Sequence, residues 1–128
     1  MSGFRPGYSP EIEKRYEKEA RKTEYSDGKY SVLMPHDANE IINEGRMLQH
    51  CVGNAGYIRK MAEGLCTILF LRDNRDLAAP LITMEECDGS IVQCYGFRDK
   101  YNSSPEIREF IKDYASRRNL KINAVIYR

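Results

Sequence analysis

The chain has 128 residues, of which 41% are hydrophobic and 30% are charged, a composition typical of one globular domain. The 20 basic and 19 acidic side chains leave a net charge of +1, which disfavours a dedicated nucleic-acid-binding protein with its excess of Lys and Arg. No apolar stretch is long enough to span a membrane, and the first residues do not resemble a signal peptide. We therefore expect a cytoplasmic protein whose 4 cysteines are thiols.

The N-terminal part predicts a flexible lead-in and one outer helix. Residues 1–8 contain Gly and Pro, and a single domain is expected over residues 9–128. Ser9-Pro10-Glu11 is typical of a helix start, and the helix is predicted over residues 9–22. Its apolar stripe is narrow, so we expect this helix to lie on the outside of the domain or to meet a partner; the stripe consists of Ile12, Tyr16 and Ala20.

The next segment predicts one short strand and two helices. A strand is expected over residues 30–34, where Pro35 stops it. Asp37 and Glu40 have the spacing of a capping box, and the helix that they start is predicted to end just before His50. A third, short helix is expected over residues 57–63, closed by Gly64.

The second half predicts most of the sheet. Residues 66–71 are apolar on both faces, which indicates a central strand, and residues 81–87 and 91–97 flank the turn Asp88-Gly89-Ser90. Residues 104–114 repeat the helix start and carry an apolar stripe, and residues 121–127 predict a last strand. The predicted fold class is α+β, a small, mainly antiparallel sheet of about four or five strands packed with about three or four helices.

The hairpin register separates an apolar face from a polar one. A three-residue turn pairs Met84 with Cys94 and places both on one face with Ile82 and Val92. The opposite face then carries Thr83, Glu85, Gln93 and Tyr95, with Glu85 directly across from Gln93. One face of an antiparallel sheet often meets water, and that is the expectation here; the alternative is a binding or catalytic surface.

Several segments of the chain, which follow one another in the same order as in a known family, resemble that family. They are Lys29-Tyr30-Ser31-Val32, residues 44–53 with His50-Cys51-Val52-Gly53, Tyr57, Leu71-Arg72, residues 80–85 and residues 93–96. Together they resemble the PcfJ-like proteins of bacterial conjugative plasmids, phages and other mobile elements. The resemblance implies a mobile-element protein with an α+β domain. The chain departs from the family pattern at Asp99, where the family tends to have Asn; the nearest Asn is Asn102.

A catalytic hypothesis makes Cys51 a nucleophile. Cys51 lies between two predicted helices and next to His50, and a helix N-terminus or an imidazolium lowers a thiol pKa. His50 or His36 would be the base, Glu85 the orienting group and Gln93 an oxyanion donor. The opposing interpretation is that a small Cys before a Gly turn is a buried packing residue.

Metal and cofactor sites are not predicted. No Cys-x-x-Cys element is present, and Cys66 and Cys94 occupy apolar strand positions that indicate core residues. No phosphate-binding loop or hydrolase motif occurs. A basic edge suited to a nucleic-acid backbone would consist of Arg98, Lys100, Tyr101, Arg108 and Lys112. Asp99, Glu106 and Glu109 are interleaved with these residues, which favours a solvated surface of mixed charge.

The leading hypothesis is a non-enzymatic, mobile-element binding module that acts on a protein or nucleic-acid partner, with counter-defence as one role that fits. Its candidate binding residues are Tyr57, Arg72, Thr83, Tyr95 and Arg98. The alternative is an enzyme that uses His50, Cys51, Glu85 and Gln93. In both cases His50-Cys51-Val52-Gly53 is expected to face Glu85 and Gln93 across the sheet; the oligomeric state is not predicted.

Overall fold

The computed structural model describes residues 9–53, 55–97 and 104–124. These residues form an α+β fold with four α-helices and six strands, which confirms the predicted class with slightly more strands than expected. The elements in chain order are α1 (Pro10–Thr23), β1 (Tyr25–Ser26), β2 (Tyr30–Leu33), α2 (Ala38–Leu48), the 3₁₀ helix η1 (Cys51–Gly53), α3 (Ala55–Ala62), β3 (Cys66–Asp73), β4 (Ile82–Cys87), β5 (Ser90–Tyr95), α4 (Pro105–Arg117) and β6 (Lys121–Ile122). No helix in the described part of the chain is long and apolar enough to cross a membrane.

The strands form one sheet whose spatial order follows the chain. Each strand pairs with the next, and every pair is antiparallel except β5 with β6, which is parallel. β3 lies between β2 and β4 and is buried from Cys66 to Arg72, so the predicted central strand is confirmed. The short strand β1 was not predicted, because two residues carry too little periodicity to recognise.

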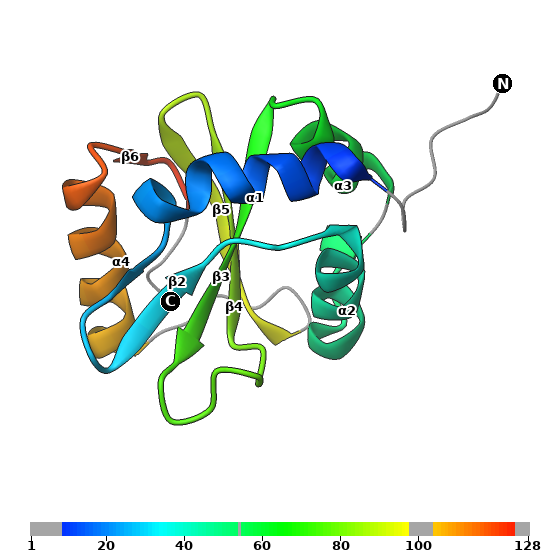
Figure 1. The fold of residues 1–128 in the computed structure, drawn as a ribbon. Helices are drawn as coiled ribbons and strands as arrows, with labels where there is room; N and C mark the ends of the chain where they lie inside the picture. The colour runs from blue at the N-terminus through cyan, green and yellow to red at the C-terminus, as the bar shows by residue number, and fades with distance from the viewer. Residues whose placement is uncertain (1–8, 54, 98–103, 125–128) are drawn as a thin grey trace, which may run out of the picture.

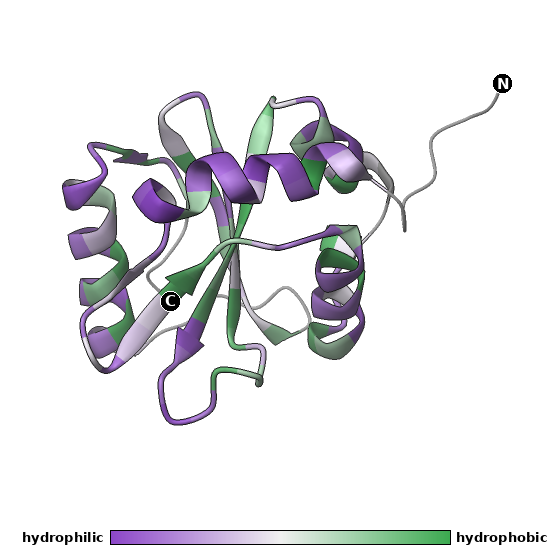
Figure 2. Cartoon of the chain, in the orientation of Figure 1, coloured by the Kyte–Doolittle hydropathy of each residue, from purple (hydrophilic) through white to green (hydrophobic). Residues whose placement is uncertain are grey.

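Helices cover both faces of this sheet. In Figure 1, α4 lies on one side of the strands, α2 and α3 lie on the other, and α1 crosses in front of them. The cluster on the α4 side includes Leu69, Met84 and Tyr114, whereas the cluster on the α2–α3 side includes Ile41, Ile58 and Ile68. Figure 2 shows the hydrophobic residues concentrated on the strands and on the sides of the helices that face them. The sheet is therefore the middle layer of three.

The hairpin has a shorter turn than predicted. Cys87 pairs with Ser90, so only Asp88 and Gly89 form the turn. Both have positive φ, at 54° and 81°, as a two-residue turn of the I′ type requires. The predicted three-residue turn is therefore wrong, because Asp-Gly supplies a complete turn by itself.

A β-bulge nevertheless restores the predicted register. The pairing shifts between Glu85 and Glu86, and Val92 is the extra residue on β5. Val92 is consequently half-buried, and Ile91 replaces it in the core of the α4 side. Beyond the bulge the structure has both predicted cross-strand pairs, Glu85 with Gln93 and Met84 with Cys94.

The helix α1 is anchored by one side chain more than by its apolar stripe. Ile12 is fully buried, while half of the residues of the helix are exposed. Arg15 donates from Nη1 to the carbonyl oxygens of Met61 and Cys66 at 2.9 and 2.8 Å, and from Nη2 to Thr67 Oγ1 at 2.6 Å. The outer helix thus meets α3 and the start of β3 of its own chain.

Two cysteines are joined rather than free. Cys66 and Cys87 lie directly opposite each other on β3 and β4, 4.4 Å apart at Cα, and form a disulfide. The prediction of four thiols is wrong for this pair, because it was based on compartment and ignored the cross-strand register. Cys94 is a buried free thiol on the α4 side.

Tyr114 makes the free energy of unfolding depend on pH in the alkaline range. Its hydroxyl donates to the carbonyl oxygen of Thr23 at 2.7 Å, and burial raises the pKa of Tyr114 to about 12, from 10.0. Between these values the folded chain retains a proton that the unfolded chain has lost. We therefore expect unfolding experiments in urea to show a stability that is intact below pH 10 and falls by about 2–3 kcal/mol as the pH approaches 12. The Tyr114→Phe variant lacks this contribution, so its free energy of unfolding should fall less steeply between pH 10 and 12. An equal fall for the variant and the wild type would contradict the prediction.

Candidate functional site

A buried ion pair joins α2 to the sheet. Glu44 lies on the inner side of α2, between Ile41 and Leu48, and is 1% exposed. Arg72 of β3 donates to both carboxylate oxygens of Glu44, from Nη1 to Oε2 at 3.1 Å and from Nη2 to Oε1. The Arg72 guanidinium also lies over the ring of Phe70, 4.8 Å from its centroid. Two opposite charges are thus held together out of water.

Thr83 and His50 extend this pair into a hydrogen-bond network. The Thr83 hydroxyl donates to Glu44 Oε2 at 2.9 Å, and its oxygen lies 2.8 Å from His50 Nε2. The Val52 backbone N–H donates to His50 Nδ1 at 3.3 Å. One proton arrangement satisfies all three contacts, in which the His50 Nε2–H donates to Thr83 and Nδ1 accepts. We name Arg72, Glu44, Thr83 and His50 the buried network.

His50 reaches the sheet because α2 ends in a sharp turn. Gln49, at the C-cap, has the left-handed backbone conformation, with φ 53° and ψ 46°. The chain then turns back over the sheet, and the His50 ring contacts Tyr95 edge-on at 5.1 Å between centroids. Thr83 and Tyr95 are cross-strand partners, so His50 covers this pair.

The helix α3 covers the next cross-strand pair, Glu85 with Gln93. Lys60 Nζ lies 3.1 Å from Glu85 Oε2, and Gln93 Nε2 donates to the Tyr57 hydroxyl at 3.4 Å. Glu85, like Thr83 and Tyr95, is buried. The prediction that this polar face meets water is therefore wrong, because α2, η1 and α3 cover it.

A pocket of about 490 Å³ opens beside the buried network. Glu44 and Arg72 are among its lining residues, and the Tyr16 and His36 rings, stacked at 3.9 Å between centroids, line another part. Much of the remaining wall is apolar and comes from the end of β2, the residue after it, β3 and the segment between β3 and β4; these residues are Leu33, Met34, Phe70, Leu77, Ala78 and Pro80. A volume of this order suits a small ligand or one inserted side chain.

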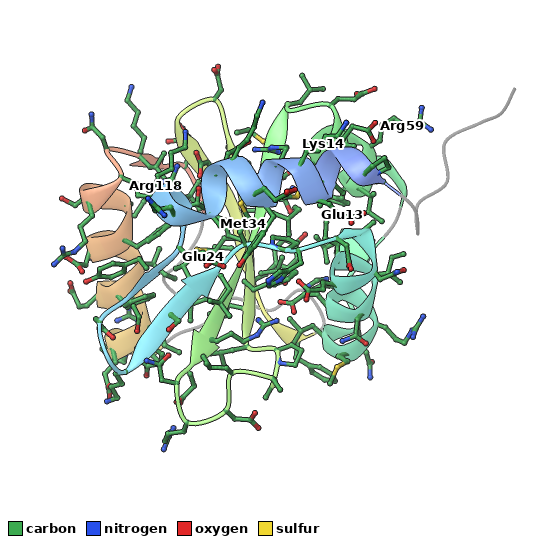
Figure 3. The ribbon with its side chains drawn as sticks, viewed as in Figure 1. Glu13, Lys14, Glu24, Met34, Arg59 and Arg118 are labelled. Carbon is green, nitrogen blue, oxygen red and sulfur yellow. A yellow bond between two sulfur atoms is a disulfide. The ribbon has the colours of Figure 1, made fainter. Side chains whose placement is uncertain are left out.

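Three carboxylates give the pocket an acidic rim. Glu24 accepts from the Met34 backbone N–H at 2.9 Å, and Asp37 accepts from the Glu40 N–H at 3.0 Å. In Figure 3 the labelled Glu24 and Met34 lie beside each other. Glu40 in turn accepts from the His36 N–H at 2.8 Å. Within the described residues, none of the three is in an ion pair with Lys or Arg. The His36 Nδ1 atom also lies 3.1 Å from Glu40 Oε1. Backbone hydrogen bonds thus fix the acidic rim, and no described Lys or Arg neutralises it.

Comparison with known proteins identifies the family. The family model described as PcfJ-like protein matches residues 7–111. The chain belongs to the PcfJ-like family. The uncharacterized protein Lin1253/Lin1744 of Listeria innocua is 35% identical over 104 residues, which are 80% of this chain and 22% of that protein. The chain therefore spans about a fifth of the length of this relative. No solved structure matches the chain of the present protein.

The predicted site residues of this PcfJ-like protein gather in two places. His50, Arg72, Thr83 and Tyr95 meet around the buried network. Tyr57 of α3 meets Gln93, whose cross-strand partner is Glu85. Of the segment His50-Cys51-Val52-Gly53, expected to face Glu85 and Gln93, His50 contacts Thr83, which lies one cross-strand pair away from Glu85 and Gln93. Arg98, Asp99 and Asn102 lie outside the described residues.

The catalytic hypothesis stays a prediction. The backbone of Cys51 belongs to η1, while its side chain lies outside the described part of the structure. Both ring nitrogens of His50 are within hydrogen-bond distance of other groups, Thr83 and the Val52 N–H. His36 lies before the first turn of α2 and His50 after its last turn, about 16 Å apart along the helix, so His36 is not part of the buried network.

Sequence reasoning missed Glu44 and Lys60. Glu44 is three residues after Ile41 and four before Leu48, so the helical period already places it on the buried stripe of α2. A charged residue on a buried stripe signals a buried partner, and that signal was available. Lys60 is half-exposed and follows Tyr57 by three residues, so nothing in the pattern of α3 sets it apart.

Proposed function

We propose that this PcfJ-like protein is a mobile-element binding module that uses the acidic-rimmed pocket to hold a basic, apolar segment of a protein partner. One observation supports this most directly, namely three carboxylates around an apolar hollow that backbone hydrogen bonds fix and that, among the described residues, have no Lys or Arg partner. The mobile-element context comes from the family resemblance, and no enzymatic step is needed for this function.

The rim charge favours a cationic group over a nucleic acid. Glu24, Asp37 and Glu40 are acidic side chains, and Arg72 is already paired with Glu44. A phosphate backbone brought to this rim would be repelled, whereas an Arg or Lys side chain would gain charge-assisted hydrogen bonds. The charge pattern therefore selects a protein partner from the two predicted classes.

The apolar wall favours a peptide over a lone cation. Leu77 is 50% exposed, one of the few large hydrophobic side chains in the described residues that solvent reaches to this extent. Leu33, Met34 and Phe70 extend the apolar surface into the pocket. A basic side chain flanked by an apolar one would place charge on the rim and bury the neighbouring residue against this wall.

Peptide binding tests the proposal. We expect the fluorescence polarisation of short labelled peptides that carry Arg beside Leu or Phe to rise when the wild-type chain is added and binds them. The triple variant Glu24→Gln, Asp37→Asn, Glu40→Gln keeps the hydrogen-bond acceptors and the helix cap but removes three charges. It should bind these peptides at least about tenfold more weakly, a difference of about 1.4 kcal/mol.

The matched control is Glu13→Gln, Glu17→Gln, Glu63→Gln, which removes the same charge at exposed positions outside the pocket. It should bind like the wild type. Equal losses in both triple variants would show a non-specific charge effect and overturn the proposal. So would single-stranded DNA that binds in a manner dependent on the rim, or peptides that show no preference for basic over acidic sequences.

A further inference from the structure

The disulfide lies at the opposite end of β3 from the pocket, and a third ligand-type side chain is beside it. Cys66 is the first residue of β3, and Cys87 is the last of β4. Glu85, two residues before Cys87, projects from the same face of β4. One ligand atom from each of Cys66, Cys87 and Glu85 lies within 4.8 Å of the other two. The register thus brings two sulfurs and a carboxylate to one point.

Glu85 has an oxygen that its surroundings do not satisfy. The residue is 3% exposed, and its Oε2 has no hydrogen-bond partner among the described residues. Lys60 Nζ lies 3.1 Å from this oxygen, but its side chain is 42% exposed and the contact is an ion pair by distance only. A buried carboxylate oxygen without a hydrogen bond is costly, so a metal ion bound to it would lower the free energy of the folded chain.

We propose that the reduced chain binds a zinc-like divalent metal ion through Cys66 Sγ, Cys87 Sγ and a Glu85 carboxylate oxygen. Two thiolates and a carboxylate carry three negative charges; the ion neutralises two of them and replaces the Lys60 ammonium as the cation at the Glu85 oxygen. Thiolate with carboxylate is a ligand set that suits Zn²⁺, and its tetrahedral geometry leaves one position for water or another ligand. Cys87 is half-exposed, so solvent reaches the site.

The geometry fits both redox states. The Cα atoms of Cys66 and Cys87 are 4.4 Å apart, as in a non-hydrogen-bonded pair of an antiparallel sheet. In such a pair the two side chains approach each other most closely. Reduction breaks the S–S bond, and the two electrons come from a cellular dithiol that becomes a disulfide. The two thiols then lose their protons to solvent as the metal binds. Metal and disulfide therefore exclude each other.

The sequence prediction overlooked this site because its cysteines are 21 residues apart and belong to two strands. Zinc spacing rules describe ligands on one tight turn. Here the hairpin-like pairing of β3 with β4 replaces the turn.

Cobalt titration of the full chain tests the site. Reduced, oxygen-free wild-type protein should bind one Co²⁺ and develop a thiolate-to-cobalt charge-transfer band, which added Zn²⁺ abolishes. The oxidised chain should show no band. Cys66→Ser and Cys87→Ser should each lose it, and Glu85→Gln should weaken binding by about tenfold or more. Circular dichroism shows whether each variant is folded.

Two further variants keep the test decisive if a ligand variant fails to fold. Cys94→Ser removes a buried thiol on the other face of the sheet and should leave the band unchanged. Lys60→Met, at a half-exposed position, removes the competing ammonium and should tighten Co²⁺ binding several-fold. Absence of the band in the reduced wild type overturns the proposal, even if the disulfide itself forms and breaks reversibly. Equal binding by Cys66→Ser and the wild type does so as well.

Discussion

Replacing Arg72 with methionine is expected to lower the free energy of unfolding by about 3–5 kcal/mol. Methionine retains much of the side-chain length but removes the guanidinium that donates to both oxygens of Glu44. Glu44 is 1% exposed, so its carboxylate would be left charged, buried and bonded mainly to Thr83. Urea unfolding followed by circular dichroism at neutral pH measures the loss.

The double variant Glu44→Met, Arg72→Met separates the pair from its surroundings. Removing both charges should recover most of the loss, because no unpaired charge remains in the interior. The surface control is Arg75→Met, since Arg75 pairs with Asp73 but its side chain is 88% exposed. That variant should change the stability by less than about 1 kcal/mol. A double variant as unstable as the sum of the two single variants would contradict the interpretation.

The polar face of the hairpin was expected to meet water, and the structure shows why that expectation is wrong. Thr83, Glu85 and Tyr95 alternate with the apolar residues of the hairpin, as strands with one wet face do. This alternation does not indicate which elements cover the face. The covering elements α2, η1 and α3 come from residues 38–62 and pack on it through long-range contacts. Periodicity within a strand reports a difference between faces, but not what lies against each face.

Local chemistry, in contrast, was predictable. Asp37 caps α2 as its spacing with Glu40 indicated, and Gly64, with φ 78°, follows the last turn of α3. Cys94 lies in the core, as its apolar strand position indicated. These features depend on residues within a few positions of one another. The disulfide and the Glu44–Arg72 pair join residues more than 20 positions apart, and only the fold brings them together.

The second large effect is expected at Gly45, within the segment that resembles the family. A Cβ built on Gly45 would lie 2.6 Å from the backbone nitrogen of Gly53 and 3.2 Å from the carbonyl oxygen of His50. The reverse contact is also close, since a Cβ on Gly53 would lie 3.1 Å from the Cα of Ile42. The backbones of α2 and η1 therefore touch, and glycine at both positions permits this approach.

Gly45→Ala should lower the free energy of unfolding by about 1–3 kcal/mol, as overpacking of a close contact does. Alanine improves the helix propensity by about 1 kcal/mol, but the obstacle here is backbone, which cannot rotate away as a side chain can. The variant must move η1, and with it His50, whose Nε2 lies 2.8 Å from the Thr83 oxygen. Urea unfolding gives the stability, and the imidazole NMR resonances of His50 report the loss of that contact.

Arg46→Ala is the matched control, because Arg46 is the next residue of α2 and is exposed. It should unfold within about 0.5 kcal/mol of the wild type, as most surface substitutions do. A Gly45→Ala variant as stable as this control would show that η1 does not depend on the close approach. The His50-Cys51-Val52-Gly53 segment would then need another explanation for its final glycine. If the loss is as expected, the segment acts first as a support that places His50 over Thr83, and any chemistry there depends on that placement.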